Sequence, residues 1–276
     1  MDCKTGKELL QEKLPITKKP VKFMLIGFLQ LGFFSLLLLI LYKITILDWR
    51  YSIIGEIIAS FFAILPYAYV TINSKKIRLK YREKYKDLAF QHVWFRFLSY
   101  NEPISAASLF FPILLKTDYF LPKIINLPLN QFTKSIMPIY IVIPLGIFLL
   151  IFGMLIRRPT GGYDSDIGSY MYLIFPENSR KLNGGLYNYL RHPNYAGRGV
   201  VALGIGILAN NILAIILAII HFTWFYILSK VEDRELVKRF GESFKSFKKD
   251  VPAIIPKIRN FKPFLKMVFL GDKKNN

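Results

Sequence analysis

The sequence contains several apolar runs long enough to cross a lipid bilayer, and these runs constrain the fold more than any other feature. A transmembrane helix needs about 20 mostly apolar residues, because each residue rises about 1.5 Å and the hydrocarbon core is about 30 Å thick. Residues 24–47, 51–72 and 136–156 meet this requirement with at most one charged side chain each. The runs favour an integral membrane protein over an ordinary soluble domain.

Two further segments are less regular. Residues 200–228 are apolar but are interrupted by Asn210 and Asn211, which predicts a helical hairpin of two antiparallel arms joined by a polar turn. Residues 93–115 make a poorer span by hydropathy, because Arg96, Asn101, Glu102 and Pro103 lie among the apolar residues.

Basic residues predict the orientation, since lysine and arginine are enriched in cytoplasmic loops. Six lysines precede the first run, and seven basic residues follow the second: Lys4, Lys7, Lys13, Lys18, Lys19 and Lys22, then Lys75, Lys76, Arg78, Lys80, Arg82, Lys84 and Lys86. We therefore expect the amino terminus, the 73–87 loop, the 157–195 loop and the basic tail from Lys230 to be cytoplasmic.

This orientation requires one more crossing between residues 88 and 135, for which 93–115 is the only candidate. The predicted fold class is an all-α polytopic membrane protein with about six transmembrane helices, including the C-terminal hairpin. It would lie in the cell membrane of a prokaryote or in the endoplasmic reticulum of a eukaryote. We expect an N-terminal membrane region over 1–135 and a second region with the hairpin and basic tail over 136–276.

Composition excludes several other classes. The formal net charge is +20, but 53% of the residues are hydrophobic, so the charge is best interpreted as a topology signal and as contact with anionic lipid headgroups rather than nucleic-acid binding. The same hydrophobicity excludes a disordered chain. A single cysteine, Cys3, excludes a disulfide scaffold, and three scattered histidines predict no metal site.

The chemistry is expected at the cytoplasmic mouth of the hairpin. Arg191 and His192 lie about 19 residues before its turn, and Glu232 and Asp233 lie about 22 residues after it, so the two pairs should sit at similar depth. Such a site suits a zwitterionic cofactor, whose carboxylate and cationic group would meet side chains of opposite charge. The alternative is that these residues form interfacial ion pairs that anchor the helix ends.

Two motifs resemble a known family. Residues 185–197, GLYNYLRHPNYAG, resemble the G-x-Y-x-x-x-R-H-P-x-Y-x-G signature of the isoprenylcysteine carboxyl methyltransferase and phospholipid methyltransferase superfamily. The tail, VEDRELVKRFGESFKSFKKDVPAIIP, is similar to that family's E-E-x-x-L-x-x-x-F-G-x-x-Y-x-x-Y-x-x-x-V-P-x-x-I-P ending. The resemblance covers about residues 136–256 and does not extend to 1–135.

The resemblance implies S-adenosylmethionine bound at the cytoplasmic face and methyl transfer to a lipophilic acceptor, either an isoprenylcysteine carboxylate or a lipid. The cofactor-binding residues that it implies are Tyr187, Arg191, His192, Pro193, Asn194, Tyr195, Gly197, Glu232 and Asp233. Pro193 would stop the loop from running into the helix, and Gly197 would allow close backbone approach. A carboxylate acceptor needs no general base, so no catalytic acid or base is named.

This sequence departs from the family pattern at several positions. The second acid is Asp233, Leu228 stands where many members have arginine, and Phe244 and Phe247 replace the two tyrosines of the tail. These changes affect the expected fit of the acceptor and of the cofactor.

Two other functions remain open from the sequence. Membrane reductases that use NADPH on sterols or fatty chains carry a similar R-H-P-N-Y motif, but Arg198 stands where they typically have an acid. A non-enzymatic membrane scaffold is the third possibility. Within the spans, we expect a neutral His221 hydrogen-bonded to a neighbouring helix, and Glu56 either paired with Arg96 or lining the acceptor cavity.

Overall fold

The computed structural model describes residues 6–116, 124–157, 166–179 and 184–271. Within these ranges the regular structure is entirely helical. The α-helices are α1 Gly6–Lys13, α2 Pro20–Leu47, α3 Tyr51–Ile72, α4 Ser74–Tyr85, α5 Ala89–Val93, α6 Asn101–Phe110, α7 Ile139–Arg157, α8 Asp166–Ile174, α9 Pro193–Ala209, α10 Ile212–Phe240, α11 Glu242–Asp250 and α12 Phe261–Leu270. The shorter turns are η1 Pro15–Lys18, η2 Lys86–Leu88, η3 Trp94–Leu98, η4 Phe111–Leu115, η6 Pro176–Asn178, η7 Gly185–Asn188 and η8 Ile258–Asn260.

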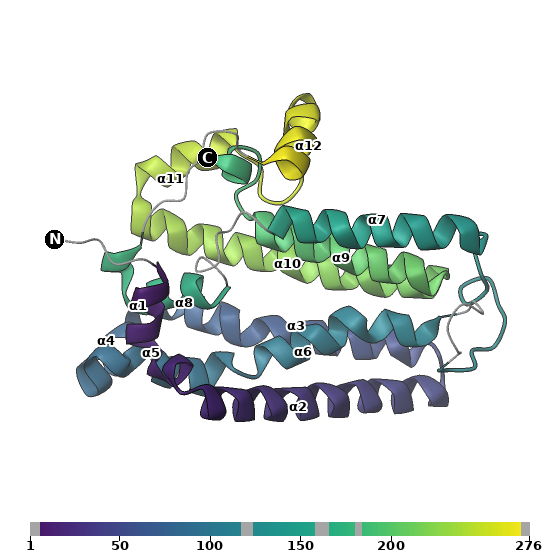
Figure 1. The fold of residues 1–276 in the computed structure, drawn as a ribbon, viewed down its shortest axis with the longest axis horizontal. Coiled ribbons are helices and arrows are strands. Elements are labelled where there is room, and N and C mark those ends of the chain that lie inside the picture. The colour runs from purple at the N-terminus through teal and green to yellow at the C-terminus, as the bar shows by residue number, and fades with distance from the viewer. Residues whose placement is uncertain (1–5, 117–123, 158–165, 180–183, 272–276) are drawn as a thin grey trace.

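Four helices of the described chain, α2, α3, α7 and α10, are long and apolar enough to cross a membrane. They run side by side with α6 and α9, and Figure 1 shows α2, α3 and α6 on one side of the bundle and α7, α9 and α10 on the other. The prediction of an all-α polytopic membrane protein is confirmed. The count of six spans and the division at residue 135 remain predictions.

The predicted hairpin is formed by α9 and α10, with its turn at Asn210 and Asn211. Asn210 adopts a left-handed backbone with φ 56°, and the Asn211 side chain caps α10 by accepting from the amide of Ala214 at 2.8 Å. Both asparagines are buried, and hydrogen bonds from their side-chain amides to the backbone of Met137 and Leu115 satisfy their polar groups. The polar turn therefore joins the hairpin to the start of α7 and the end of η4.

The less regular segment 93–115 forms a broken helix in which the π-turn η3 precedes α6 and η4 follows it. It packs lengthwise against α2 and α3. Asn101, Ser105 and Ser108 on α6 are buried between helices. These three polar side chains lower the hydropathy of the segment but face the interior of the bundle, whereas Arg96 is exposed.

Glycines bring α7 and α9 into close contact. A Cβ atom added at Gly153 of α7 would lie 2.7 Å from the carbonyl oxygen of Gly197, and one added at Gly197 would lie 2.5 Å from the carbonyl oxygen of Gly153. Small residues permit such close packing of membrane helices. The close backbone approach expected at Gly197 is therefore an approach to α7.

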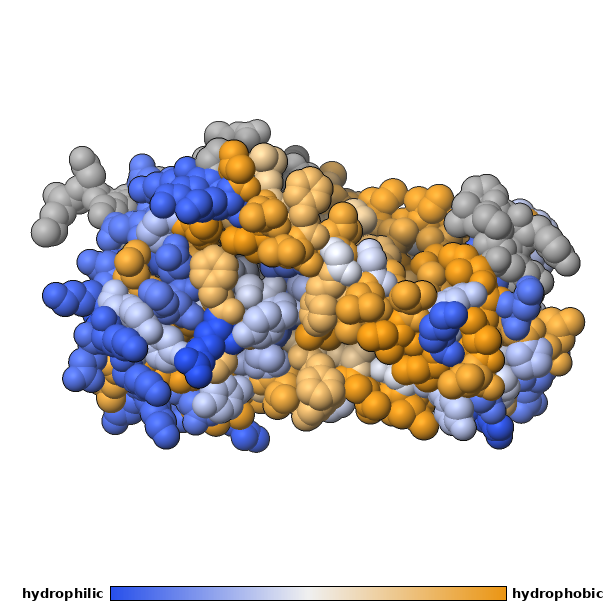
Figure 2. Space-filling view, turned by 90° about the horizontal axis from the view of Figure 1, so that it is seen from below, coloured by the Kyte–Doolittle hydropathy of each residue, from blue (hydrophilic) through white to orange (hydrophobic). Residues whose placement is uncertain are grey.

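The basic segments gather at one end of the bundle, where α1, α4, α5, α8 and α11 lie together (Figure 1). Lys13 of α1 binds Asp87 at 2.5 Å, and Arg82 of α4 binds Glu177 at 2.9 Å. Figure 2 shows hydrophilic surface concentrated at this end and a mostly hydrophobic surface along the rest of the face. This charged end holds the mouth of the hairpin.

Candidate cofactor site at the hairpin mouth

The expected convergence of cations and acids is present at the hairpin mouth. Arg191 binds Asp233 through two nitrogens, with Nε 3.1 Å from Oδ1 and Nη2 2.7 Å from Oδ2. His192 lies with Nε2 2.9 Å from Asp233 Oδ1 and Nδ1 3.4 Å from Glu232 Oε2. The helical rise of 1.5 Å per residue thus places residues 41 apart in sequence at the same depth.

Residues 248–253, at the end of α11 and directly after it, contact this cluster through their backbone carbonyls. The backbone amides of Arg191 and His192 donate to the carbonyls of Pro252 and Ala253, each at 2.9 Å. Nη1 of Arg191 also donates to the carbonyls of Lys248, at 3.1 Å, and Val251. Arg191 therefore ties α10 to the segment that follows α11, which is the anchoring role considered as the alternative.

Burial separates the two acids. The side chain of Asp233 is 0% exposed, whereas that of Glu232 is 26% exposed. Asp233 is surrounded by Arg191, His192 and the ammonium of Lys248 at 3.5 Å. Glu232 is the acid of the pair that a ligand can reach.

His192 carries a positive charge over a wider pH range than an ordinary histidine. Burial alone would lower the pKa of its imidazole, but hydrogen bonds to Asp233 and Glu232 and the charges of both acids raise it. Both ring nitrogens face carboxylates. The raised pKa favours the imidazolium form of His192 between the two acids, which makes it a poor proton acceptor.

The other motif residues lie around the start of α9. His192 occupies the N-cap and Pro193 the first helical position, as expected for the residue that sets the helix start. The ring of Tyr195 stacks on His192 with centroids 5.6 Å apart. Asn194 accepts from Nε of Arg157 at 3.0 Å, and Tyr187 is half-buried in η7.

Where the sequence departs from the family, the structure has apolar packing. Leu228 is buried in the main hydrophobic core, and Phe244 is buried on α11 with its ring 5.8 Å from that of Phe247. Residues 158–165 and 180–183 of the 157–195 loop lie outside the described residues.

The residue types at the mouth fit S-adenosylmethionine. Its amino-acid ammonium and ribose hydroxyls are donors, and Glu232 offers a partly exposed carboxylate to such groups. Asn194 and Tyr187 add half-buried polar side chains nearby in the motif. In this conformation Arg191 is not placed to bind the carboxylate of the cofactor, because Asp233 and two backbone carbonyls already bind its guanidinium.

A second polar group next to the motif was not predicted. The Tyr195 hydroxyl lies 3.3 Å from that of Tyr170, whose ring stacks on Tyr67 with centroids 4.3 Å apart. The Tyr67 hydroxyl donates to Glu102 at 3.0 Å, and Glu102 lies 3.5 Å from the guanidinium of Arg198. The only sequence signal was Arg198 itself, as a departure from the reductase motif.

A third polar group lies deeper in the bundle. Ser108 of α6 bonds Glu56 of α3 and lies 2.8 Å from Nδ1 of His221 of α10, while Ser60 donates to Glu56 at 2.7 Å. The predicted bond from His221 to a neighbouring helix is confirmed. Of the two alternatives for Glu56, the pairing with Arg96 is excluded, because Arg96 is exposed and Glu56 is completely buried among α3, α6 and α10.

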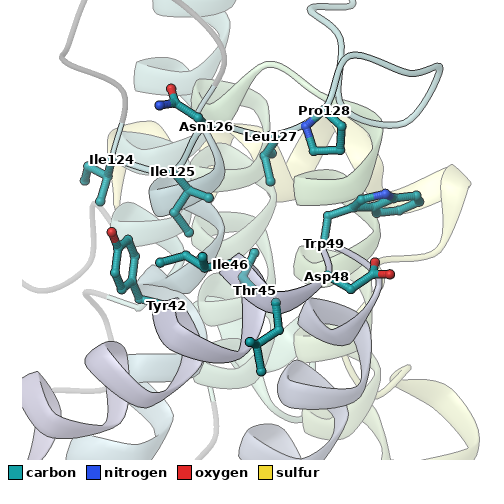
Figure 3. A pocket seen from close by; sticks show the side chains of 11 residues that line it. Tyr42, Thr45, Ile46, Asp48, Trp49, Ile124, Ile125, Asn126, Leu127 and Pro128 are labelled. Atoms are coloured by element: carbon teal, nitrogen blue, oxygen red, sulfur yellow. The ribbon is translucent and has the colours of Figure 1, made fainter.

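A cavity of about 500 Å³ lies at the opposite end of the bundle, between the end of α2 and residues 124–128 (Figure 3). Both apolar and polar side chains line it, and Asp48, one of the lining residues, is paired with Arg50. It contains none of the motif residues, so the hairpin mouth remains the candidate cofactor site.

Together, the fold and the site define a polytopic membrane protein with a buried cluster of charged side chains at the open end of the α9–α10 hairpin. Residues 141–243 match the family model described as phospholipid methyltransferase. The match lies over the hairpin region, whose motifs resemble the isoprenylcysteine carboxyl methyltransferase and phospholipid methyltransferase superfamily.

The chain is similar to three curated protein-S-isoprenylcysteine O-methyltransferases over part of its length. It is 36% identical over 75 residues to that of Schizosaccharomyces pombe, covering 27% of this chain and 32% of the relative. It is 28% identical over 118 residues to the relative from Dictyostelium discoideum, covering 41% of this chain and 48% of the relative. It is 27% identical over 124 residues to the relative from Homo sapiens, covering 42% of each chain.

The alignments thus span about a third to a half of the length of these relatives. No solved structure matches the chain significantly. All three relatives are named as methyltransferases.

Proposed function

We propose that the protein is an integral membrane methyltransferase that uses S-adenosylmethionine to methylate a lipophilic acceptor, with an isoprenylcysteine-type carboxylate as the leading candidate. The observation that carries this proposal is the cluster of Arg191, His192, Glu232 and Asp233 at the hairpin mouth, inside the region that matches the family.

In this proposal the cluster residues have different tasks. Glu232 accepts hydrogen bonds from the cofactor, with Tyr187, Asn194 and Tyr195 completing the pocket wall. Arg191 and Asp233 hold the hairpin and the tail in register, so that the pocket keeps its shape before the ligand arrives.

The bound cofactor would supply a methyl group on a sulfonium, so that an O–CH₃ bond forms while the S–CH₃ bond breaks and its electron pair stays on sulfur. A carboxylate acceptor then becomes a neutral ester, and no proton has to be removed. This suits a site in which both ring nitrogens of the buried His192 face carboxylates. The residues contribute alignment and exclusion of water, which raises the reactivity of a carboxylate.

We infer that both termini and the cofactor pocket face the cytoplasm, in the cell membrane of a prokaryote or the endoplasmic reticulum of a eukaryote. The gathering of α1, α4 and α11 at one charged end supports this orientation. The acceptor would enter from the bilayer between helices, since its apolar chain prefers that phase.

Isothermal titration of the full chain in detergent with S-adenosylhomocysteine tests the proposal. We expect saturable binding that Glu232→Gln weakens while the helical circular dichroism spectrum is retained. Absence of binding at millimolar ligand by a folded protein would overturn the proposal. Thermal stabilisation by NADPH but not by S-adenosylhomocysteine would instead support a reductase.

A further inference from the structure

Arg198 lies one helical turn beyond Tyr195 on α9, on the bundle side of the cofactor motif. The neighbours described next come from two other helices, α6 and α10. Nη2 is 3.5 Å from Glu102 and Nη1 is 3.4 Å from Ser105, both on α6, and the guanidinium lies 5.5 Å from the ring centre of Phe225 on α10. Through Glu102 it also connects to Tyr67 on α3. The group therefore lies where the region without family resemblance meets the hairpin.

The contacts of Arg198 to these polar neighbours are long compared with those of Arg191. Arg191 holds Asp233 at 2.7 Å in a fully buried pair, whereas Arg198 and Glu102 are 3.5 Å apart and Glu102 is 37% exposed. Charge-assisted nitrogen–oxygen bonds are usually about 2.7–2.9 Å long. The Arg198–Glu102 pair is therefore weaker and can exchange its carboxylate, while the Arg191–Asp233 pair is a fixed part of the structure.

The surroundings suit an amphiphilic carboxylate. The side chain of Arg198 is only 12% exposed, so its charge is poorly solvated. Four buried aromatic side chains lie around it and the motif, namely Tyr67, Tyr170, Tyr195 and Phe225. A carboxylate attached to an apolar chain could meet the guanidinium while its chain packs on these rings.

We propose that Arg198 binds the carboxylate of the lipophilic acceptor, and that Glu102 occupies the guanidinium until the acceptor displaces it. Glu102 keeps the hydrogen bond from the Tyr67 hydroxyl after the exchange. This inference rests on the proposed methyltransferase function and adds the residue that selects an anionic acceptor. Arg198 would also position the carboxylate beside Tyr195 of the motif.

An amine headgroup fits the same place less well. Glu102 could attract an ammonium, but the guanidinium of Arg198 lies 3.5 Å away and would repel it. An ammonium must also lose a proton before it is methylated, and His192, with both ring nitrogens facing acids, is unsuited to receive it. The geometry therefore favours an acceptor that is already anionic.

The test compares Arg198→Gln, Arg198→Lys and Glu102→Gln with Lys230→Gln as a charge-matched control on α10. Lys230 contacts the ring of Tyr226 and takes no part in the Arg198 group. The probe is an N-acetylated S-farnesyl cysteine in detergent. Its binding is measured by thermal stabilisation, its methylation gives KM and kcat, and S-adenosylhomocysteine affinity measures the cofactor site separately.

We expect Arg198→Gln to raise the KM and the apparent Kd for the probe by about 10–100-fold, the usual effect of losing a charge-assisted pair. Arg198→Lys should retain part of the affinity, and Glu102→Gln should lower the KM because it removes the competing carboxylate. S-adenosylhomocysteine affinity should change less than about twofold in each variant, well below the tenfold change that corresponds to about 1.4 kcal/mol.

Unchanged probe affinity in Arg198→Gln, with wild-type affinity for S-adenosylhomocysteine, would overturn the role of Arg198 and leave the methyltransferase proposal standing. Methylation of a phosphatidylethanolamine vesicle that Glu102→Gln abolishes would also overturn it, in favour of an amine acceptor. Failure of the wild-type protein to bind S-adenosylhomocysteine would refute the underlying function, and the inference with it.

Discussion

Asp233 is bound by Arg191 through both carboxylate oxygens and is completely buried, although the adjacent Glu232 is partly exposed. Successive residues on an α-helix point about 100° apart, so two neighbouring acids can serve different purposes. Asp233 faces the core and the tail, and Glu232 faces the proposed cofactor pocket. The two acids should therefore respond differently to neutralisation.

Asp233→Asn should destabilise the protein by about 3–5 kcal/mol, because it leaves the Arg191 guanidinium buried without its carboxylate. Glu232→Gln should change the stability by less than about 1 kcal/mol but weaken S-adenosylhomocysteine binding. Thermal and denaturant unfolding in detergent, with titration of the same samples, measures both effects. Equal losses of stability in the two variants would contradict this division of roles.

The stability should also depend on His192 and pH in a defined direction. The pKa of His192 is raised in the folded protein above its ordinary value of 6.5, despite its burial, because Asp233 and Glu232 face both ring nitrogens. The stabilisation from the imidazolium is therefore fully present below about pH 6.5 and is lost as the pH rises through the folded-state pKa.

Unfolding of the wild type and His192→Gln between about pH 5.5 and 9 measures this contribution. The difference in unfolding free energy should be largest at acidic pH and should shrink as the pH rises. A difference that grows with pH would mean that His192 is buried as the neutral form.

The close contact of α7 and α9 predicts a large effect from a small substitution. Gly197→Ala places a methyl group 2.5 Å from both the Gly153 carbonyl oxygen and the Arg157 side chain, so the helices must move apart. We expect a loss of about 1–3 kcal/mol. Gly32→Ala on α2 is the matched control, since a Cβ there meets nothing within 4 Å.

The control should raise the stability by up to about 1 kcal/mol through helix propensity. The two thermal midpoints, measured in the same detergent, should therefore move in opposite directions. If Gly197→Ala were as well tolerated as Gly32→Ala, the α7–α9 contact would not be as close as the structure has it.

The sequence predicted the hairpin well but not the environment of its turn. Asn210 and Asn211 interrupt an apolar run and so mark the turn locally. Their burial depends on the backbone of Met137 and Leu115, which lie 73 and 96 residues away. No local pattern contains that information.

The same limit applies to the candidate site. The helical rise was sufficient to predict that Arg191 and His192 meet Glu232 and Asp233, because all four belong to one hairpin. Which acid is buried depends on how the segment after α11 folds back over Arg191. Arg198 was not predicted as a site residue because Glu102 and Tyr67 come from the region that shows no family resemblance.

The buried group of Glu56, Ser108 and His221 supplies a last prediction. Ser108 bridges the carboxylate and the imidazole, whose closest approach is 3.7 Å, so α3, α6 and α10 are joined through polar atoms in an apolar interior. Because one member cannot be removed without leaving the others buried, Glu56→Gln and His221→Asn should each destabilise the protein, and their effects should not be additive. A double-mutant cycle in detergent should give a coupling energy of about 1–3 kcal/mol.

The matched cycle of Glu56→Gln with Arg96→Gln should give a coupling near zero, since Arg96 is exposed. The opposite ranking of the two couplings would restore the Glu56–Arg96 pair and rule out the connection through Ser108.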